Sequence, residues 1–290
     1  MTTGFVDRRQ VARRFGRVAA TYDRGDFFVR EVDRRMQERL DYVRLTPKRI
    51  LDLGASRGGS FPGLQARYPD AGLIGLDLSP AMLGAGRKAQ PRWQRWLGLG
   101  DDQPLGLAAD AASLPLRNAT ISLVWSNLLL HWLDNPIPAL AEAYRVLEVG
   151  GLLMFSALGP DTLKELRAAF ADHDAHTQRF ADMHDLGDML VGCGFADPVM
   201  DMEVITLTYD DFDAMLSELR AAGSACAMKD RRRGLLGRQQ WLAVKTRYEA
   251  LRRDGKLPAT FEVIYGHAWK AAPKQTPDGR AIVRFEKLNK

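Results

Sequence analysis

A glycine-rich turn between two aspartates is the segment best suited to holding a ligand. Residues 52–59 read DLGASRGG and follow an apolar stretch typical of a buried strand. Glycines in such a turn let the backbone approach a ligand closely and leave the first N–H groups of the next helix free. A second acid, Asp77, ends the next apolar stretch 19 residues beyond Gly58, where a carboxylate can accept hydrogen bonds from both ribose hydroxyls. The pattern predicts a site for a cofactor that contains ribose.

The charge beside the turn distinguishes two kinds of cofactor. The turn is one substitution from the dinucleotide fingerprint G-x-G-x-x-G and one from the D-x-G-x-G-x-G turn of methyltransferases, because Ser56 stands where both patterns have glycine. Asp52 lies two residues before Gly54. A negative charge there suits the ammonium group of a methionine moiety and is unfavourable beside a pyrophosphate. Asp52 therefore favours S-adenosylmethionine over a dinucleotide.

Strand and helix patterns alternate around this turn. Two amphipathic helices come first, with Val11, Phe15, Val18 and Tyr22 expected on one face of the first helix. Strands are then expected at 49–53, 73–77, 105–109, 121–126 and 151–157, with a helix over about 139–147 that Gly150 closes. Strands separated by helices predict an α/β fold with a parallel sheet covered on both faces.

The second half of the chain predicts helical additions to this fold. Helical patterns cover 161–170, 186–190 and 210–253, and further strands are expected at 204–209 and 261–265. The domain organisation we expect is an N-terminal helical lid over 1–45, followed by one Rossmann-like domain over 46–290. Insertions are expected within that domain at about 160–195 and 210–255.

Two further segments resemble the class I S-adenosylmethionine-dependent methyltransferases. They are residues 110–116, DAASLPL, and residues 121–128, ISLVWSNL. Any one acid at a strand exit can equally cap a helix or form a turn, but three in the right order favour a cofactor site. In that family the acid after the third strand hydrogen-bonds the adenine amino group. The resemblance implies a seven-stranded, mostly parallel sheet and a cofactor site made of Asp52, Gly54, Ser56, Gly58, Asp77, Leu78, Asp110, Ala111 and Asn127.

Other segments resemble a narrower family, the malonyl-acyl-carrier-protein O-methyltransferases of biotin synthesis. These are residues 14–23, RFGRVAATYD, residues 76–83, LDLSPAML, the pair His131-Trp132, and residues 258–261, PATF. The resemblance implies methyl transfer to the free carboxylate of a malonyl group held by an acyl carrier protein. It also implies that Tyr22 closes over the cofactor, although a core position would suit Tyr22 as well.

The turn departs from this family at one position. Where the family usually has glycine this chain has Ser56, which is tolerable at negative φ and otherwise costs about 1 kcal/mol. Ser56 therefore keeps a non-catalytic assembly protein open as an alternative. A second alternative is the protein arginine hydroxylase that helps to assemble respiratory complex I, because its C-terminal stretch resembles residues 260–269.

The expected chemistry explains the lack of an obvious catalytic pair. A malonyl carboxylate is ionised at neutral pH, so a methyl acceptor of this kind needs positioning and no general base. Arg220, in the second insertion, could orient the acyl group or could face solvent. The run Arg231, Arg232 and Arg233 could dock an acidic carrier protein or could be a solvated loop.

Composition excludes several other classes. The net charge is +5, but the basic residues are not arranged as a stripe with interleaved aromatics, so no nucleic-acid partner is expected. Apolar stretches such as 152–155 are too short to cross a membrane, and no secretory signal precedes the helices. Cys193 and Cys226 have no zinc-site spacing, and His173 and His176 are better explained by a polar bend than by a metal. A cytoplasmic enzyme without a metal is expected.

Overall fold

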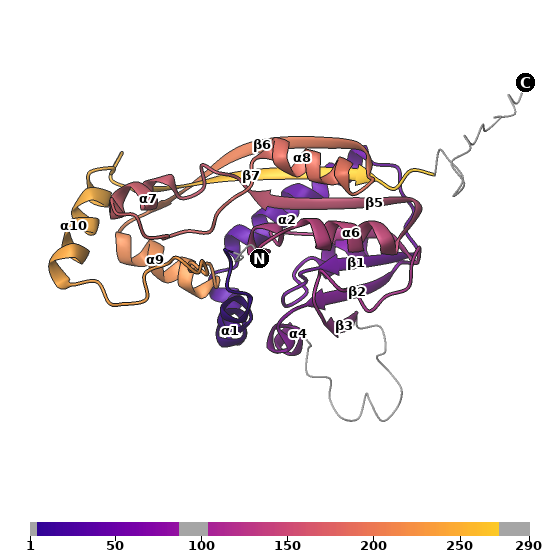
Figure 1. Cartoon of the computed structure of the whole chain (residues 1–290), viewed down its shortest axis with the longest axis horizontal. Coiled ribbons are helices and arrows are strands. Elements are labelled where there is room, and N and C mark those ends of the chain that lie inside the picture. The colour runs from indigo at the N-terminus through magenta and orange to yellow at the C-terminus, as the bar shows by residue number, and fades with distance from the viewer. Residues whose placement is uncertain (1–4, 87–103, 273–290) are drawn as a thin grey trace, which may run out of the picture.

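Seven strands form one sheet in the order β3-β2-β1-β4-β5-β7-β6 in a computed structural model that describes residues 5–86 and 104–272. The strands β1 to β5 are parallel, whereas β7 runs antiparallel to both of its neighbours, β5 and β6. Their bounds are β1 (Arg49–Leu53), β2 (Gly72–Asp77), β3 (Leu105–Ala108), β4 (Ile121–Ser126), β5 (Leu147–Leu158), β6 (Ala196–Tyr209) and β7 (Leu257–Trp269). The predicted seven-stranded, mostly parallel sheet is confirmed (Figure 1).

Helices cover both faces of this sheet. The α-helices are α1 (Arg8–Val18), α2 (Phe27–Arg39), α3 (Phe61–Arg67), α4 (Pro80–Gly86), α6 (Ile137–Val146), α7 (Lys164–Phe170), α8 (Met183–Gly192), α9 (Phe212–Ala221) and α10 (Arg238–Glu249). Short 3-10 turns occur at η1 (Tyr22–Arg24), η2 (Leu40–Tyr42) and η3 (Leu130–Trp132).

Side chains that point alternately to the two faces of the sheet form two main cores, one on each face. On β1, Ile50 packs into a core with α2 and α3, while the next residue, Leu51, packs into the core with α6 and α8. Successive side chains of a strand point to opposite faces, so a continuous apolar run such as Ile50-Leu51 is what a sheet buried on both sides requires.

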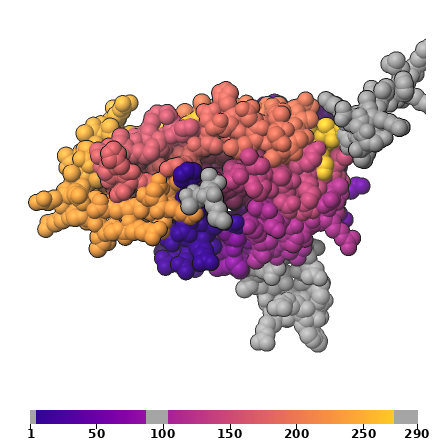
Figure 2. Space-filling model, in the orientation of Figure 1, coloured from indigo at the N-terminus to yellow at the C-terminus, as the bar shows by residue number. Residues whose placement is uncertain are grey.

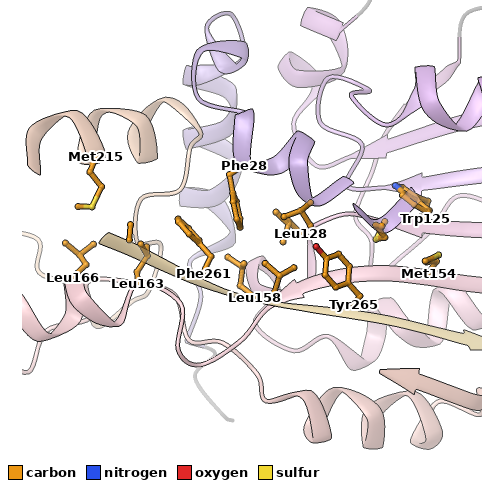
Figure 3. Packing of buried hydrophobic residues seen from close by; sticks show 14 of the residues in the cluster. Phe28, Trp125, Leu128, Met154, Leu158, Leu163, Leu166, Met215, Phe261 and Tyr265 are labelled. Carbon is orange, nitrogen blue, oxygen red and sulfur yellow. The ribbon is translucent and has the colours of Figure 1, made fainter. Parts of the chain in front are cut away.

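The first core continues into the helical insertions. Phe28 of α2 lies 4.2 Å from the ring of Phe261 on β7, measured between centroids. Beyond that pair the same core takes in Leu166 of α7 and Met215 of α9 (Figure 3). It also includes Tyr248 of α10. The long strands β6 and β7 extend past β5 and support these helices (Figure 1).

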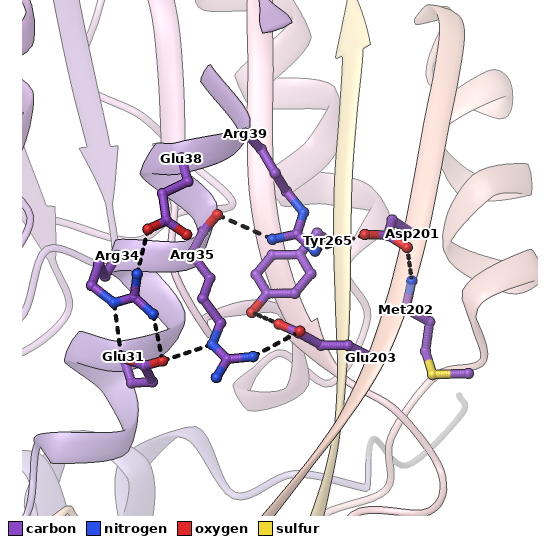
Figure 4. Close-up of polar contacts among 9 residues, drawn as sticks. All are labelled: Glu31, Arg34, Arg35, Glu38, Arg39, Asp201, Met202, Glu203 and Tyr265. Carbon is purple, nitrogen blue, oxygen red and sulfur yellow. Dashed lines mark hydrogen bonds and ion pairs between the residues drawn. The ribbon is translucent and has the colours of Figure 1, made fainter. Parts of the chain in front are cut away.

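An ion-pair network ties α2 to the antiparallel edge of the sheet. Arg35 pairs with Glu203 at 2.8 Å, and Glu203 also accepts a hydrogen bond from the Tyr265 hydroxyl at 2.5 Å. Arg39 stacks 3.6 Å above the Tyr265 ring and pairs with Asp201 at 2.6 Å (Figure 4). Half-exposed pairs add little stability singly, so their main effect is to fix the orientation of α2 on the sheet.

Several predicted boundaries were wrong. α1 ends at Val18, and Tyr22 lies on the separate turn η1. β5 begins at Leu147 directly after α6, so Gly150 does not close that helix. β6 begins at Ala196, earlier than expected, because it is an edge strand whose many polar residues hide the strand pattern. The stretch 210–253 contains two helices, separated by an irregular segment.

Candidate functional site

A cavity of about 450 Å³ opens at the carboxyl ends of β1, β2 and β4. The strand order reverses there, between β1 and β4, which is where ligands bind in open α/β sheets. Most of the predicted site residues line this cavity: Tyr22, Asp52, Gly54, Ser56, Asp77, Leu78, Asp110, Ala111, Asn127 and Arg220. Among the predicted site residues, Gly58 and the run Arg231–Arg233 are not part of its lining.

The glycine-rich turn is held against the end of β2. The N–H groups of Gly54 and Ala55 both donate to the carbonyl of Leu76, at 2.8 and 2.9 Å, and the N–H of Ser56 donates to Asp77 Oδ2 at 2.9 Å. Gly54 has φ 85° and Gly58 has φ 78°. A Cβ on Gly58 would lie 2.5 Å from the Phe61 ring, so glycine is needed there for packing of α3.

Ser56 has a left-handed backbone, with φ 53°. The condition under which serine would be tolerated, a negative φ, is therefore not met. A non-glycine residue in this region costs about 1–2 kcal/mol. The Ser56 hydroxyl is also buried, so this position combines backbone strain with a buried polar atom.

Buried carboxylates surround the turn. Asp52 is 2% exposed, and its Oδ2 has no hydrogen-bond partner within residues 5–86 and 104–272. Burial raises the pKa of Asp52 well above its usual range, and the nearby Asp33 and Asp77 carboxylates raise it further. An unpaired buried carboxylate oxygen is costly unless a cationic or donor group meets it. The ammonium group of S-adenosylmethionine fits this position.

Asp77 and Asp110 hold their carboxylates in fixed orientations. Asp77 Oδ1 accepts from the N–H of Ser79 at 2.8 Å, and burial raises the pKa of Asp77. Asp110 Oδ1 accepts from the N–H of Ala112 at 3.0 Å, while its other oxygen pairs with Arg8 of α1. Each carboxylate keeps lone pairs for further donors.

Asn127 is fixed between two elements at the exit of β4. Its Nδ2 donates to the carbonyl of Val29 at 3.0 Å, and its Oδ1 accepts from the Ser156 hydroxyl at 2.7 Å. The predicted cofactor residues that line the cavity thus come from separate strand exits.

Residues of the N-terminal segment also line this cavity. Tyr22 is buried, and burial raises its pKa to about 12, an effect that contact with Ser56 opposes. Tyr22 packs with Ala19 against Met82 of α4. Asp23, next to it, pairs with Arg57 of the turn at 2.7 Å. These contacts place Tyr22 both in a small core and against the glycine-rich turn.

The sequence pointed to His131 only as part of the family resemblance, and it gave no indication of Gln178. Burial lowers the pKa of His131 to about 3, so its ring is neutral. Its Nδ1 and the Gln178 Oε1 are buried without hydrogen-bond partners in the described part of the chain, and both residues line the cavity. The pair His131-Trp132 could have been found from the sequence, because it belongs to the segments that resemble the family. Gln178 lies in an irregular segment that no sequence pattern marks. Trp132 both lines the cavity and packs against Phe15, with ring centroids 5.1 Å apart.

The remaining predicted basic residues lie nearer the surface. Arg220 is exposed at its place on the cavity wall. Arg231 donates to the carbonyl of Met228 at 2.6 Å, Arg232 lies 3.8 Å from Asp174, and Arg233 is exposed.

Other candidate sites have structural explanations. His176 bonds to Asp172 at 2.6 Å and stacks on Phe170 with centroids 3.5 Å apart. Within the described residues, no group of side chains could hold a metal ion, and no helix is long and apolar enough to span a bilayer. Cys193 and Cys226 are free thiols.

The fold and the site define a class of protein, the Rossmann-like methyltransferases that use S-adenosylmethionine. The family model described as "Methyltransferase domain" matches residues 51–155. The YcgJ protein from Bacillus subtilis shares the fold, with a TM-score of 0.57 at 15% identity over 84% of this chain and 99% of that one.

Whole-chain relatives identify the family within this class. The malonyl-[acyl-carrier protein] O-methyltransferase of Laribacter hongkongensis is 49% identical over 98% of each chain. That of Gallionella capsiferriformans is 47% identical over 96% of each chain. The chain belongs to the malonyl-[acyl-carrier protein] O-methyltransferase family. These relatives do not favour the arginine hydroxylase or the assembly protein.

Proposed function

We propose that this enzyme transfers the methyl group of S-adenosylmethionine to the free carboxylate of a malonyl group carried by an acyl carrier protein, in the biotin pathway. The observation that carries the proposal is that one cavity is lined both by the acidic residues Asp52, Asp77 and Asp110 and by apolar residues of α7 and α9 together with Arg220. The acidic residues suit a cationic cofactor, and the apolar residues with Arg220 suit an acyl chain that carries a negative charge.

The cofactor end would be held by residues of three strand exits. Asp52 would bind the ammonium group, Asp77 the ribose hydroxyls, and Asp110 with Ala111 the adenine. S-adenosylmethionine supplies an activated methyl group on a sulfonium when it is bound. Residues 1–45 would act as a lid, with Tyr22 excluding water from this end.

The acceptor end positions its substrate and needs no base. A carboxylate acceptor is already ionised at neutral pH, and the neutral His131 is too weak a base to take a proton there. Apolar side chains such as Leu166 and Phe261 line this end and exclude water. Arg220 also lines the cavity and is the cation that we assign to orienting the acyl carboxylate. The two free thiols agree with a cytoplasmic location.

Genetic rescue combined with product analysis tests the function. The gene should restore growth without biotin to a bacterium that lacks its own malonyl methyltransferase. The purified protein should form the methyl ester and S-adenosylhomocysteine, both detectable by mass spectrometry. Asp52→Ala should fail in both assays, because the ammonium group loses its partner. Soluble wild-type protein that neither rescues growth nor forms the ester would overturn the proposal.

Arg220 has its own test within the same assay. Arg220→Gln should raise the KM for the malonyl carrier and leave the KM for S-adenosylmethionine unchanged, since Arg220 is not among the residues proposed to hold the cofactor. Arg238→Gln, an exposed arginine outside the cavity lining, is the matched control. Equal KM values in both variants would remove Arg220 from the site.

A further inference from the structure

The helix α1 has two faces of opposite character. Val11, Ala12 and Phe15 line the cavity from one side of it. Arg9, Arg13 and Arg17 follow one another at four-residue spacing and are all exposed. Residues four apart share a helix face, and at 100° per residue this arginine face points away from the cavity-lining face.

Helix stability does not explain the arginine face. Like charges four residues apart disfavour a helix, and basic residues in the first turn oppose the helix dipole. None of Arg9, Arg13 and Arg17 has an ion-pair partner among residues 5–86 and 104–272. On α2, by contrast, Arg34 and Arg35 both pair with Glu31 at 2.7 Å. Arg9, Arg13 and Arg17 thus carry charges that no ion pair within the described residues compensates.

A second basic segment borders α1. The N–H of Asp7 donates to the carbonyl of Ala227 at 2.9 Å, and the N–H of Lys229 donates to that of Phe5 at 2.8 Å. Burial lowers the pKa of the nearby Arg14, and the charge of Arg231 lowers it further. Figure 2 shows the N-terminal residues, in indigo, at the surface beside the orange insertion that contains this segment.

We propose that the exposed face of α1, with the adjoining segment 229–233, is the docking surface for the acidic carrier protein, and that docking is coupled to cofactor binding. This inference rests on the proposed function, which requires a carrier at the cavity. Charge complementarity selects an acidic protein helix as the occupant, because three arginines along one helix face match a row of carboxylates.

The coupling follows from the position of α1 between carrier and cavity. Arg8 pairs with Asp110 at the predicted adenine position, and Asp23 pairs with Arg57 of the glycine-rich turn. A cofactor in the cavity would contact the residues of α1 that line it and so stabilise the position that α1 has in this structure. A carrier docked on the outer face favours the same position. Each ligand therefore raises the affinity for the other, by the same factor.

Charge reversal on the intact protein tests the docking surface. The triple variant Arg9→Glu, Arg13→Glu, Arg17→Glu should raise the KM for malonyl-carrier protein by about tenfold or more at low salt and reduce its salt dependence. Its Kd for S-adenosylmethionine, measured without carrier protein, should not change. The matched control is Arg44→Glu, Lys48→Glu, Arg117→Glu, three exposed residues near the amino ends of β1 and β4, away from the cavity.

Binding measurements separate this inference from the proposed function. Fluorescence anisotropy with labelled malonyl-carrier protein should give a Kd at least about threefold lower in the presence of S-adenosylhomocysteine. If wild type forms the methyl ester but the α1 variant has the wild-type KM at low salt, the docking surface is refuted. An unchanged Kd with S-adenosylhomocysteine overturns the coupling. If the α1 face binds DNA or anionic vesicles while carrier affinity is unaffected by the triple reversal, its partner is not the carrier.

Discussion

Replacing Asp77 with alanine should weaken cofactor binding by a calculable amount. In the folded protein each Asp77 oxygen accepts one backbone N–H, from Ser56 at 2.9 Å and from Ser79 at 2.8 Å. Its remaining lone pairs can accept both ribose hydroxyls. Two hydrogen bonds to a charged group, at about 1.5–3 kcal/mol each, correspond to a rise in Kd of about 10²- to 10⁴-fold.

The same change affects the turn itself. Without Asp77 the N–H groups of Ser56 and Ser79 lose their acceptor, which lowers the free energy of unfolding. Removal of a buried carboxylate with a raised pKa partly offsets this loss. We expect a net destabilisation of about 1–3 kcal/mol, measured by thermal unfolding without ligand.

Calorimetry with two ligands distinguishes ribose contact from loop damage. Wild type should bind S-adenosylhomocysteine far more tightly than its 2′,3′-dideoxy analogue, whereas Asp77→Ala should bind the two alike. Asp70→Ala, which removes an exposed carboxylate, is the control. The reasoning is refuted if Asp77→Ala keeps wild-type affinity, or if it distinguishes the two ligands as wild type does.

Three further changes test the lid and the turn. Deleting residues 1–24 should leave a folded core with little activity, because Val11 and Tyr22 pack in small clusters separate from the two main cores; near-normal turnover would contradict a lid. Asp52→Asn should weaken binding of S-adenosylmethionine yet raise Tm at pH 7. The pKa of Asp52 in the folded protein lies above its ordinary 3.8, so the free energy of unfolding of the wild type falls as pH rises from 3.8 to that raised pKa. The Tm gain of Asp52→Asn should therefore vanish in acid. A Tm gain independent of pH would contradict this. Ser56→Gly should relieve about 1 kcal/mol of backbone strain and raise Tm by about 2–4 °C without loss of cofactor affinity; a lower Tm would show that the serine side chain contributes more than the strain costs.

The order of strands, turns and acids was readable from the sequence. Apolar runs set the parallel strands, and the carboxyl ends of parallel strands meet at one edge of a sheet. Asp52, Asp77 and Asp110 each follow such a run, so local patterns were enough to predict that they would line one cavity. The edge strand β6 was predicted too short because its many polar residues interrupt the apolar run that marks a strand.

Only the tertiary structure decided how segments far apart in the chain meet. The left-handed φ of Ser56 depends on how the turn packs against β2, which no local pattern specifies. The pairing of Arg8 with Asp110 joins residues more than a hundred positions apart. His131 Nδ1 lacks a hydrogen-bond partner among residues 5–86 and 104–272 because of what surrounds it. Burial and long-range contact set backbone strain, charge pairing and the pKa of a side chain, whereas sequence patterns report mainly on local structure.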